Sequence, residues 1–282
     1  MYAWKDYWAN LARSYGSVDA QGFAPVLHPD APSWFNYTTD RLQEKSWRRG
    51  LKCCQLKEDS FVLDVGCGTG RWLRRYLQQR LRPLGLDATE NMLRRAIAGG
   101  LTCPVVAAQA QRLPFRDGSF ELVSAVTVVQ HISSLDQRDV LKEMARVLRP
   151  GGHLILIELI RGEAPHIFPR SPEDWVRMAA STGLSLVCSE GQEYLLLDRA
   201  FVQFTQTVRR FAGHKSGPVL PGQCDNPAAG AKNKSAGRVM YWGGRRIACK
   251  LSEWVEPLAR RICPSTWATH GLFVFQKHNG VK

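Results

Sequence analysis

The feature of this sequence that most constrains its fold is the stretch from Phe61 to Gly70, where a short apolar run ends in a glycine loop. The near-continuous apolar run predicts a strand covered on both faces. Gly66 and Gly68, together with Gly70, permit backbone torsions closed to other residues and let a ligand lie against the main chain. Apolar residues then recur at helical spacing. A strand, a glycine loop and a helix in this order suit a nucleotide-type ligand.

The glycine spacing indicates which nucleotide is bound. A dinucleotide fingerprint has glycines at its first, third and sixth positions, whereas the sixth position here is Arg71. Two acids complete a different pattern, because Asp64 precedes the loop and Asp87 closes the next apolar run. The stretch resembles the S-adenosylmethionine loop of class I methyltransferases. In that family the glycine loop packs against the amino-acid end of the cofactor, and an acid at the position of Asp87 holds the ribose hydroxyls.

Two further segments are similar to the same family. The segment from Gln109 to Phe115 looks like its Asp-Ala-Glu-x-Leu-Pro-Phe stretch, whose acid commonly contacts adenine; the amide of Gln109 can still accept a hydrogen bond there. The segment from Leu148 to Leu154 matches its Leu-Arg-Pro-Gly-Gly-x-Leu ending. The resemblance implies S-adenosyl-L-methionine as the cofactor, held by Asp64, Gly66, Cys67, Gly68, Thr69, Gly70, Asp87, Ala88, Met92, Gln109 and Ala110.

The alternation of strands and helices, repeated five times, predicts an α/β fold with a parallel sheet and helices on both faces. The resemblance implies a seven-stranded, mostly parallel, doubly wound Rossmann-like sheet whose last strand is antiparallel and inserted beside its predecessor. We place the last three strands at His153 to Leu159, Leu184 to Cys188 and Gly271 to Phe275, and read Arg149 to Gly152 as a helix end and turn.

The chain of 282 residues is somewhat larger than one typical domain, which predicts one core with extensions. We divide it into an N-terminal helical, aromatic lid (1–50), an S-adenosylmethionine-binding core (51–199), a basic insertion (200–265), and the last core strand and tail (266–282). In the first part we favour core packing for Trp4 and Trp8 over contact with the acceptor, and leave Tyr37 open. The middle of the insertion, Lys215 to Gly237, reads as a loop.

Targeting and metal signals are missing from the sequence. No run of about 18 apolar residues exists and the start lacks the apolar stretch of a secretory signal. We therefore predict a cytoplasmic protein without an integral membrane segment, and leave peripheral membrane contact open. The eight cysteines show no metal spacing with histidines, so we predict no metal.

The predicted activity is transfer of a methyl group from S-adenosylmethionine to a nucleophile. His131 follows the fourth strand, at the edge of the sheet where the acceptor would sit. An imidazole with a pKa of about 6.5 can take a proton from a hydroxyl, although a hydrogen-bonded structural histidine is the alternative. Two other functions stay open: a binding protein that lost catalysis, and a nicotinamide-dependent oxidoreductase, which Arg71 disfavours.

We predict the class of acceptor from the charge of the final part of the chain. Residues 200–282 hold 13 Lys or Arg and 3 Asp or Glu, which a solvated basic surface also explains. In the family, insertions at this place commonly shape the acceptor pocket, and arginine suits bidentate contact with phosphate or carboxylate. The arginines are Arg209, Arg210, Arg238, Arg245, Arg246, Arg260 and Arg261. We therefore favour O-methylation of a small-metabolite or glycan-type, anionic acceptor over RNA.

Overall fold

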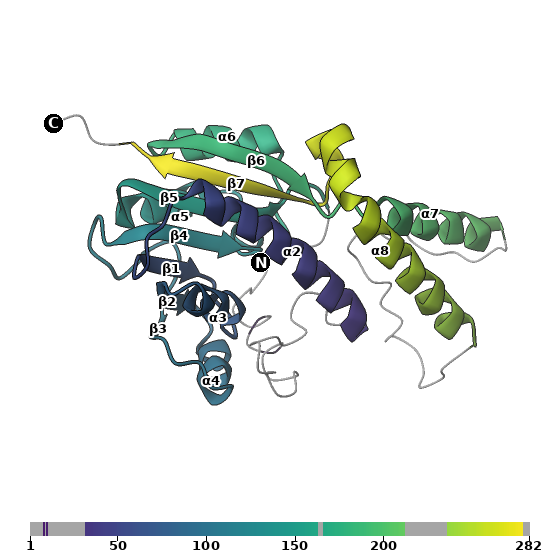
Figure 1. Ribbon diagram of the computed structural model, residues 1–282, viewed down its shortest axis with the longest axis horizontal. Helices are drawn as coiled ribbons and strands as arrows, with labels where there is room; N and C mark the ends of the chain where they lie inside the picture. Colours follow the sequence, from purple (N-terminus) through teal and green to yellow (C-terminus); the bar gives the residue numbers. More distant parts are fainter. Residues whose placement is uncertain (1–7, 9, 11–31, 163–165, 212–235, 279–282) are drawn as a thin grey trace.

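The computed structural model describes residues 8, 10, 32–162, 166–211 and 236–278. In this part of the chain a seven-stranded sheet lies between layers of helices (Figure 1). The strand order is β3-β2-β1-β4-β5-β7-β6, and β7 is antiparallel to both of its neighbours. This order confirms the predicted Rossmann-like sheet with its inserted last strand.

Strands and helices alternate up to β6, as the apolar periodicity predicts. The strands are β1 (Phe61–Val65), β2 (Arg82–Asp87), β3 (Val105–Ala107), β4 (Phe120–Val126), β5 (Leu148–Leu159), β6 (Leu184–Gln192) and β7 (His270–Lys277). The α-helices are α2 (Ser33–Cys53), α3 (Arg71–Gln78), α4 (Glu90–Ala98), α5 (Gln137–Val147), α6 (Pro172–Ala180), α7 (Leu196–Phe211) and α8 (Ala236–Ile262). Two short 3₁₀ helices are η1 (Val129–His131) and η3 (Ser265–Trp267).

The boundaries of β5 and β6 differ from the prediction. β5 begins at Leu148, so the four residues that we read as a helix end and turn belong to the strand. They fit there because the register shifts: Leu148 pairs with Phe120, and His153 pairs with Leu122. This irregularity takes up the extra residues on one side of the ladder. β6 continues past Cys188 to Gln192 because it stays paired with β7.

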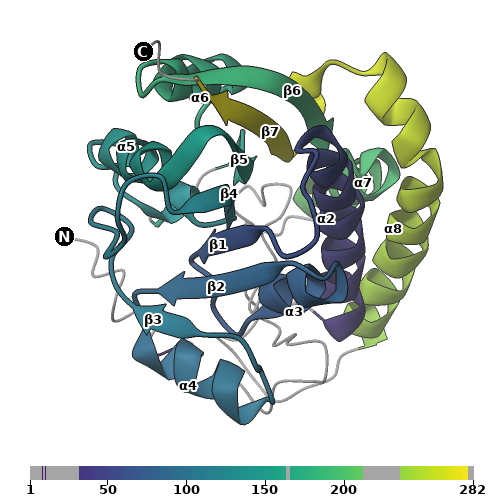
Figure 2. The same cartoon turned by 60° about the vertical axis from the view of Figure 1, so that its left-hand side comes forward.

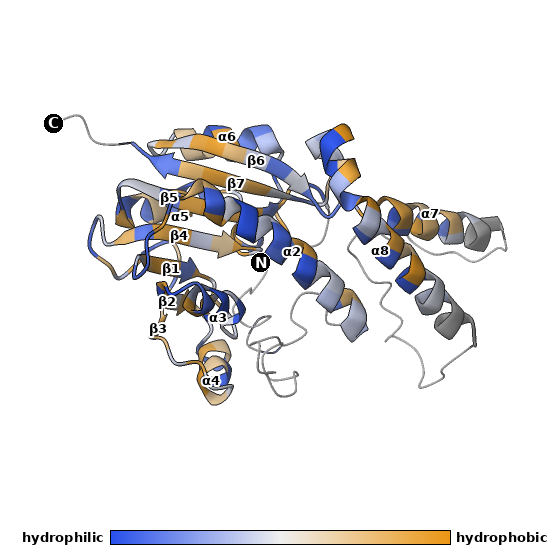
Figure 3. Ribbon diagram, in the orientation of Figure 1, coloured by the Kyte–Doolittle hydropathy of each residue, from blue (hydrophilic) through white to orange (hydrophobic). Residues whose placement is uncertain are grey.

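Each face of the sheet carries its own apolar core, and Figure 3 shows the hydrophobic strands between them. On one face, Trp47 of α2 is fully buried and packs on Trp72 and Tyr76 of α3, with ring centroids 5.5 and 5.2 Å apart. On the other face, Trp175 of α6 is buried with residues of α5. α2 is thus a layer of the core, and the lid role of residues 1–50 stays a prediction.

The insertion between β6 and β7 forms a helical pair, α7 and α8, that extends beyond the sheet (Figures 1 and 2). α8 packs on α7, α2 and β6. The predicted loop from residue 215 lies outside the described residues, apart from its last two residues, which begin α8. Among the described helices, none is long and apolar enough to cross a membrane.

Candidate cofactor and acceptor site

The glycine loop joins β1 to α3 with its backbone folded onto β2. The amides of Gly66 and Cys67 both donate to the carbonyl of Leu86, at 2.7 and 3.0 Å. Gly66 (φ +70°) is tightly packed, because a Cβ there would come within 2.4 Å of Val128. Gly68 (φ +53°) differs, since a Cβ there would meet no atom of the described residues within 4 Å. The main chain at Gly68 therefore faces open space that a ligand can fill.

Asp64 and Asp87 lie at the carboxyl ends of the neighbouring strands β1 and β2. Asp87 accepts hydrogen bonds from the amides of Gly68 (2.9 Å) and Thr89 (2.8 Å), one on each oxygen, and the Thr89 side chain also donates to this carboxylate. Asp64 is buried; its Oδ1 accepts from the Ser124 hydroxyl at 2.8 Å, whereas its Oδ2 has no hydrogen-bond partner among the described residues. An unpaired buried carboxylate oxygen suits a ligand that brings a cation or a hydrogen-bond donor.

Burial governs the titration of both acids. It raises the pKa of Asp64 to about 7, against the hydrogen bond from Ser124 and the attraction of Arg71. It also raises the pKa of Asp87, although the amides of Thr89 and Gly68 oppose the shift. A cationic ligand would favour the ionised form of each carboxyl, because opposite charge stabilises it.

The other residues predicted to hold the cofactor lie along the same edge of the sheet. Four of them have buried side chains: Cys67, Thr69, Met92 and Ala110. Ala88 is half-buried after β2, Gln109 is exposed after β3, and Gly70 (φ +84°) caps α3. The Cys67 side chain packs in an apolar cluster with Leu73, so its backbone is the part that belongs to the loop. Contact of these residues with the cofactor stays a prediction.

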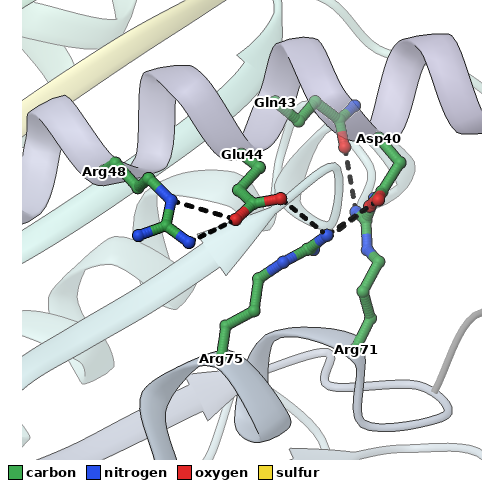
Figure 4. Close-up of polar contacts among 6 residues, drawn as sticks. All are labelled: Asp40, Gln43, Glu44, Arg48, Arg71 and Arg75. Carbon is green, nitrogen blue, oxygen red and sulfur yellow. Dashed lines mark hydrogen bonds and ion pairs between the residues drawn. The ribbon is translucent and has the colours of Figure 1, made fainter. Parts of the chain in front are cut away.

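Arg71 and Arg75 join α3 to α2 through an ion-pair cluster that the sequence analysis missed (Figure 4). Asp40 binds both guanidinium groups at 2.7 Å, one on each oxygen. Gln43 and Glu44 also accept, from Arg71 at 2.9 Å and from Arg75 at 3.3 Å. Burial alone would raise the pKa of Asp40, but the two arginines outweigh it and hold the pKa below its ordinary value. Since Arg71 directly follows the loop, the cluster anchors the glycine loop on α2.

The post-β4 loop (residues 127–131) is held by one carboxylate of β5. Glu158 is buried and accepts hydrogen bonds from the amides of Val128, Val129 and Gln130 at 3.1, 2.9 and 3.1 Å. Burial raises the pKa of Glu158 to about 7, against these three donors. Thr127 has a φ of +56°, which is rare for a β-branched residue. Such a conformation persists where the surroundings fix it, and strained loops concentrate at functional sites.

His131 ends the post-β4 loop, as the sequence predicts. Its Nδ1 lies 3.2 Å from the carbonyl oxygen of His166, which can only accept, so Nδ1 carries the proton. Nε2 accepts a hydrogen bond of 3.4 Å from the side-chain amide of Gln130. Burial lowers the pKa of His131 to about 4, so the imidazole is neutral at physiological pH. The ring of Trp8 meets His131 edge-on at 5.0 Å, and the His166 ring stacks at 5.6 Å. Trp8 thus contacts the predicted base, while its packing on the core stays a prediction; Trp4 lies outside the described residues.

Both features that the sequence analysis missed have a signal in the sequence. Asp40 and Glu44 are spaced four residues apart, as are Arg71 and Arg75, which matches two helix faces of opposite charge. Glu158 is an acid inside an otherwise apolar run at the carboxyl end of a strand. Neither pattern predicts which residues these side chains contact, because their partners are far away in the sequence.

The insertion does not present its arginines as one group. Arg245 is 1% exposed; it donates to Asp198 of α7 at 2.9 and 3.2 Å and lies 4.7 Å from the centroid of the Phe35 ring. It is therefore not available for the predicted contact with an anionic acceptor, because its charge is paired inside the protein. Of the other arginines, Arg246 and Arg261 are exposed, Arg260 is half-buried, and the side chains of Arg209, Arg210 and Arg238 lie outside the described residues.

Comparison with known proteins agrees with this geometry. Residues 62–152 match the family model described as a methyltransferase domain. Demethylmenaquinone methyltransferase from Staphylococcus carnosus is 31% identical over 169 residues, which cover 57% of this chain and 69% of that protein. The mouse protein named "Probable tRNA methyltransferase 9B" is 38% identical over 122 residues, 43% of this chain. The chain spans only 25–29% of the length of this protein and its bovine and human counterparts.

Solved structures share the fold. The cyclase SpnF superposes with a TM-score of 0.53 at 19% identity, covering 86% of this chain and 82% of its own. Phosphoethanolamine N-methyltransferase 2 from Haemonchus contortus, in complex with S-adenosyl-L-methionine, gives a TM-score of 0.50 at 17% identity, covering 82% and 53%. On the sequence matches and the sheet order together, this chain belongs to the class I S-adenosylmethionine-dependent methyltransferases.

Proposed function

We propose that this methyltransferase methylates a hydroxyl oxygen of a small-metabolite or glycan-type acceptor, with His131 as the base. The main supporting observation is that the post-β4 loop, which carries His131, packs directly on the glycine loop through Val128 and Gly66. Donor and acceptor sites on touching loops bring the reacting groups together, which is the principal contribution of a protein to methyl transfer. Relatives named for demethylmenaquinone support a small acceptor.

We assign the donor to the edge formed by β1 and β2. When bound, S-adenosylmethionine supplies a methyl group already activated by a sulfonium centre. The open backbone at Gly68 would accommodate its amino-acid end, the unpaired Oδ2 of Asp64 would attract its positive charge, and Asp87 would accept from the ribose hydroxyls. These roles follow the positions that match the family loop.

The proposed role of His131 is to remove one proton. An acceptor hydroxyl would replace the Gln130 amide as the hydrogen-bond donor to Nε2 and would give its proton to that nitrogen, while the His166 carbonyl continues to accept from Nδ1. A pKa of about 4 makes the imidazole a weak base. This suits an acceptor whose hydroxyl becomes strongly acidic as the new bond forms.

Replacement of His131 tests the role of the base. We expect His131→Ala to lower turnover with a hydroxyl acceptor by about 10²-fold or more at unchanged cofactor affinity. The control is His278→Ala, which removes an exposed imidazole and should change neither quantity. Release of S-adenosylhomocysteine, measured across a panel of phenols, quinols and sugars, gives the rate. A loss below about tenfold in the His131 variant assigns that histidine a structural role.

RNA is a second candidate because several relatives are named as tRNA methyltransferases and α8 exposes cations. An RNA surface that neutralises several phosphates should lose orders of magnitude in affinity between about 50 and 200 mM salt. Filter binding of a tRNA transcript measures this dependence. Arg246→Glu is the informative variant, since Arg245 is paired internally and its reversal would disturb the fold. Steep salt dependence abolished by Arg246→Glu would favour RNA over a small acceptor.

A further inference from the structure

The outer face of α8 carries an apolar stripe that nothing among the described residues covers. Five large apolar side chains on it are between 51% and 86% exposed: Ile247, Leu251, Trp254, Leu258 and Ile262. Their spacing of three or four residues puts them on one side of the helix. From Arg246 to Ile262 this face is about 25 Å long at 1.5 Å per residue. Monomeric proteins seldom expose a contiguous apolar surface of this extent without a partner.

The charges beside the stripe all have one sign. Arg246, Lys250 and Arg261 are exposed next to the apolar residues. The two acids of the described part of α8 point inward: Glu253 accepts from Arg41 at 2.6 Å, and Glu256 is buried and accepts from the amide of Tyr194. The outer face therefore combines exposed apolar side chains with cations and no exposed acid.

This combination favours one kind of partner. We propose that the outer face of α8 docks on the surface of an anionic phospholipid bilayer, with the helix lying in the plane of the interface. Amphipathic helices of this kind bury leucine, isoleucine and tryptophan at the acyl boundary and keep lysine and arginine at the anionic headgroups. The inference goes beyond the proposed function and does not depend on the identity of the acceptor.

Two other partners fit the face less well. A second copy related by a two-fold axis would bring the cations Arg246, Lys250 and Arg261 close to the same set of cations on its partner, with no exposed acid on the face to offset the repulsion. RNA binding favours several stacking aromatic side chains, whereas Trp254 is the one aromatic residue of this stripe.

α8 is connected to the edge of the sheet that carries the candidate site. The helix belongs to the connection between the carboxyl end of β6 and the start of β7, the same edge of the sheet that carries the glycine and post-β4 loops. Docking would therefore bring the segment that joins this edge of the sheet to the membrane surface. α4 lies away from α8 in both views (Figures 1 and 2), so it provides a control surface.

Vesicle flotation of the full chain tests the proposal. We expect binding to vesicles of equal parts phosphatidylcholine and phosphatidylglycerol at low salt, and little binding to phosphatidylcholine alone. The double variant Ile247→Asp with Trp254→Asp should lower the partition coefficient at least tenfold, while Ile97→Asp, at an exposed position of α4, should not. The triple variant Arg246→Gln, Lys250→Gln and Arg261→Gln should lose about 100-fold on anionic vesicles, at about fivefold for each cation near the surface.

A second measurement separates docking from a folding defect and from dimer formation. Brominated lipids should quench tryptophan fluorescence in the wild type and less in Trp254→Phe, which preserves the apolar character of the stripe. Light scattering gives the oligomeric state without lipid. The proposal is overturned if the wild type does not float at low salt, or if the Ile247 and Trp254 variant floats as well as the wild type. A dimer that this variant converts to monomer would assign the face to a second copy instead.

Discussion

The glycine loop and the post-β4 loop touch at Gly66 and Val128, but they are built in different ways. The groups of the glycine loop that we assign to the cofactor come from one continuous stretch, Asp64 to Asp87. The post-β4 loop depends on Glu158 and on the packing of Trp8, which are far from it in the sequence. Apart from the Asp40 cluster that anchors it, the glycine-loop site should be robust to distant changes, whereas the post-β4 loop should be sensitive to them.

The largest effect that we predict is in the α7 and α8 pair, far from the glycine loop. Asp198→Ala leaves the buried charge of Arg245 without its partner and should cost about 3–5 kcal/mol of stability. Cofactor affinity should be unchanged, because the local site does not use this pair. Thermal unfolding and calorimetry measure the two quantities. The matched control is Asp198→Leu with Arg245→Met, which removes both charges and should recover most of the stability.

The next prediction separates the fold of the glycine loop from its function. Gly68→Ala should lower cofactor affinity by about 100-fold, because the new Cβ enters the open space that we assign to the ligand. Gly100→Ala is the control, since Gly100 (φ +79°) also has open space around it and shares the left-handed strain. Both variants should lose similar stability, and Gly100→Ala should bind the cofactor normally. Equal affinity of the two variants would place the cofactor elsewhere.

The pH dependence of cofactor binding tests Asp64. Its pKa of about 7 means that the carboxyl is largely protonated below neutrality, whereas a cationic ligand favours the ionised form. Binding must then release a proton, so affinity should fall by up to tenfold per pH unit below pH 7 and level off above it. Calorimetry in buffers of different ionisation enthalpy measures the proton release. Asp64→Asn should bind more weakly at high pH and show no dependence; an unchanged dependence would exclude Asp64 as its source.

The smallest predicted effect is a loss of stability in the ion-pair cluster between α2 and α3. Arg48→Ala removes an exposed arginine that pairs with Glu44 and should cost less than about 0.5 kcal/mol. Arg75→Ala removes a half-buried guanidinium shared by Asp40 and Glu44 and should cost several times more. Chemical denaturation of both variants gives the comparison. Similar losses would mean that the buried cluster does not anchor the loop.

Much of the glycine-loop site could be predicted from the sequence. The apolar run before Gly66, the acids at positions 64 and 87, and the glycine spacing depend on residues that are close along the chain, so backbone geometry alone brings them together. The position of His131 after β4 also followed from the alternation of strands and helices. The start of β5 did not, because Leu148 joins the strand through a register shift that only the pairing with β4 defines.

The sequence by itself determined the alternation of strands and helices, the glycine loop and the edge of the sheet where the site lies, since these follow from local periodicity and spacing. The strand order came from the resemblance to a family. Only the tertiary structure decided which charges are free. Arg245 and Arg246 are neighbours in the sequence, yet one is paired with Asp198 inside the protein and the other is exposed on α8. The physical reason is that ion pairs form between charges that are close in space, and that breaking a buried pair costs several kcal/mol of stability.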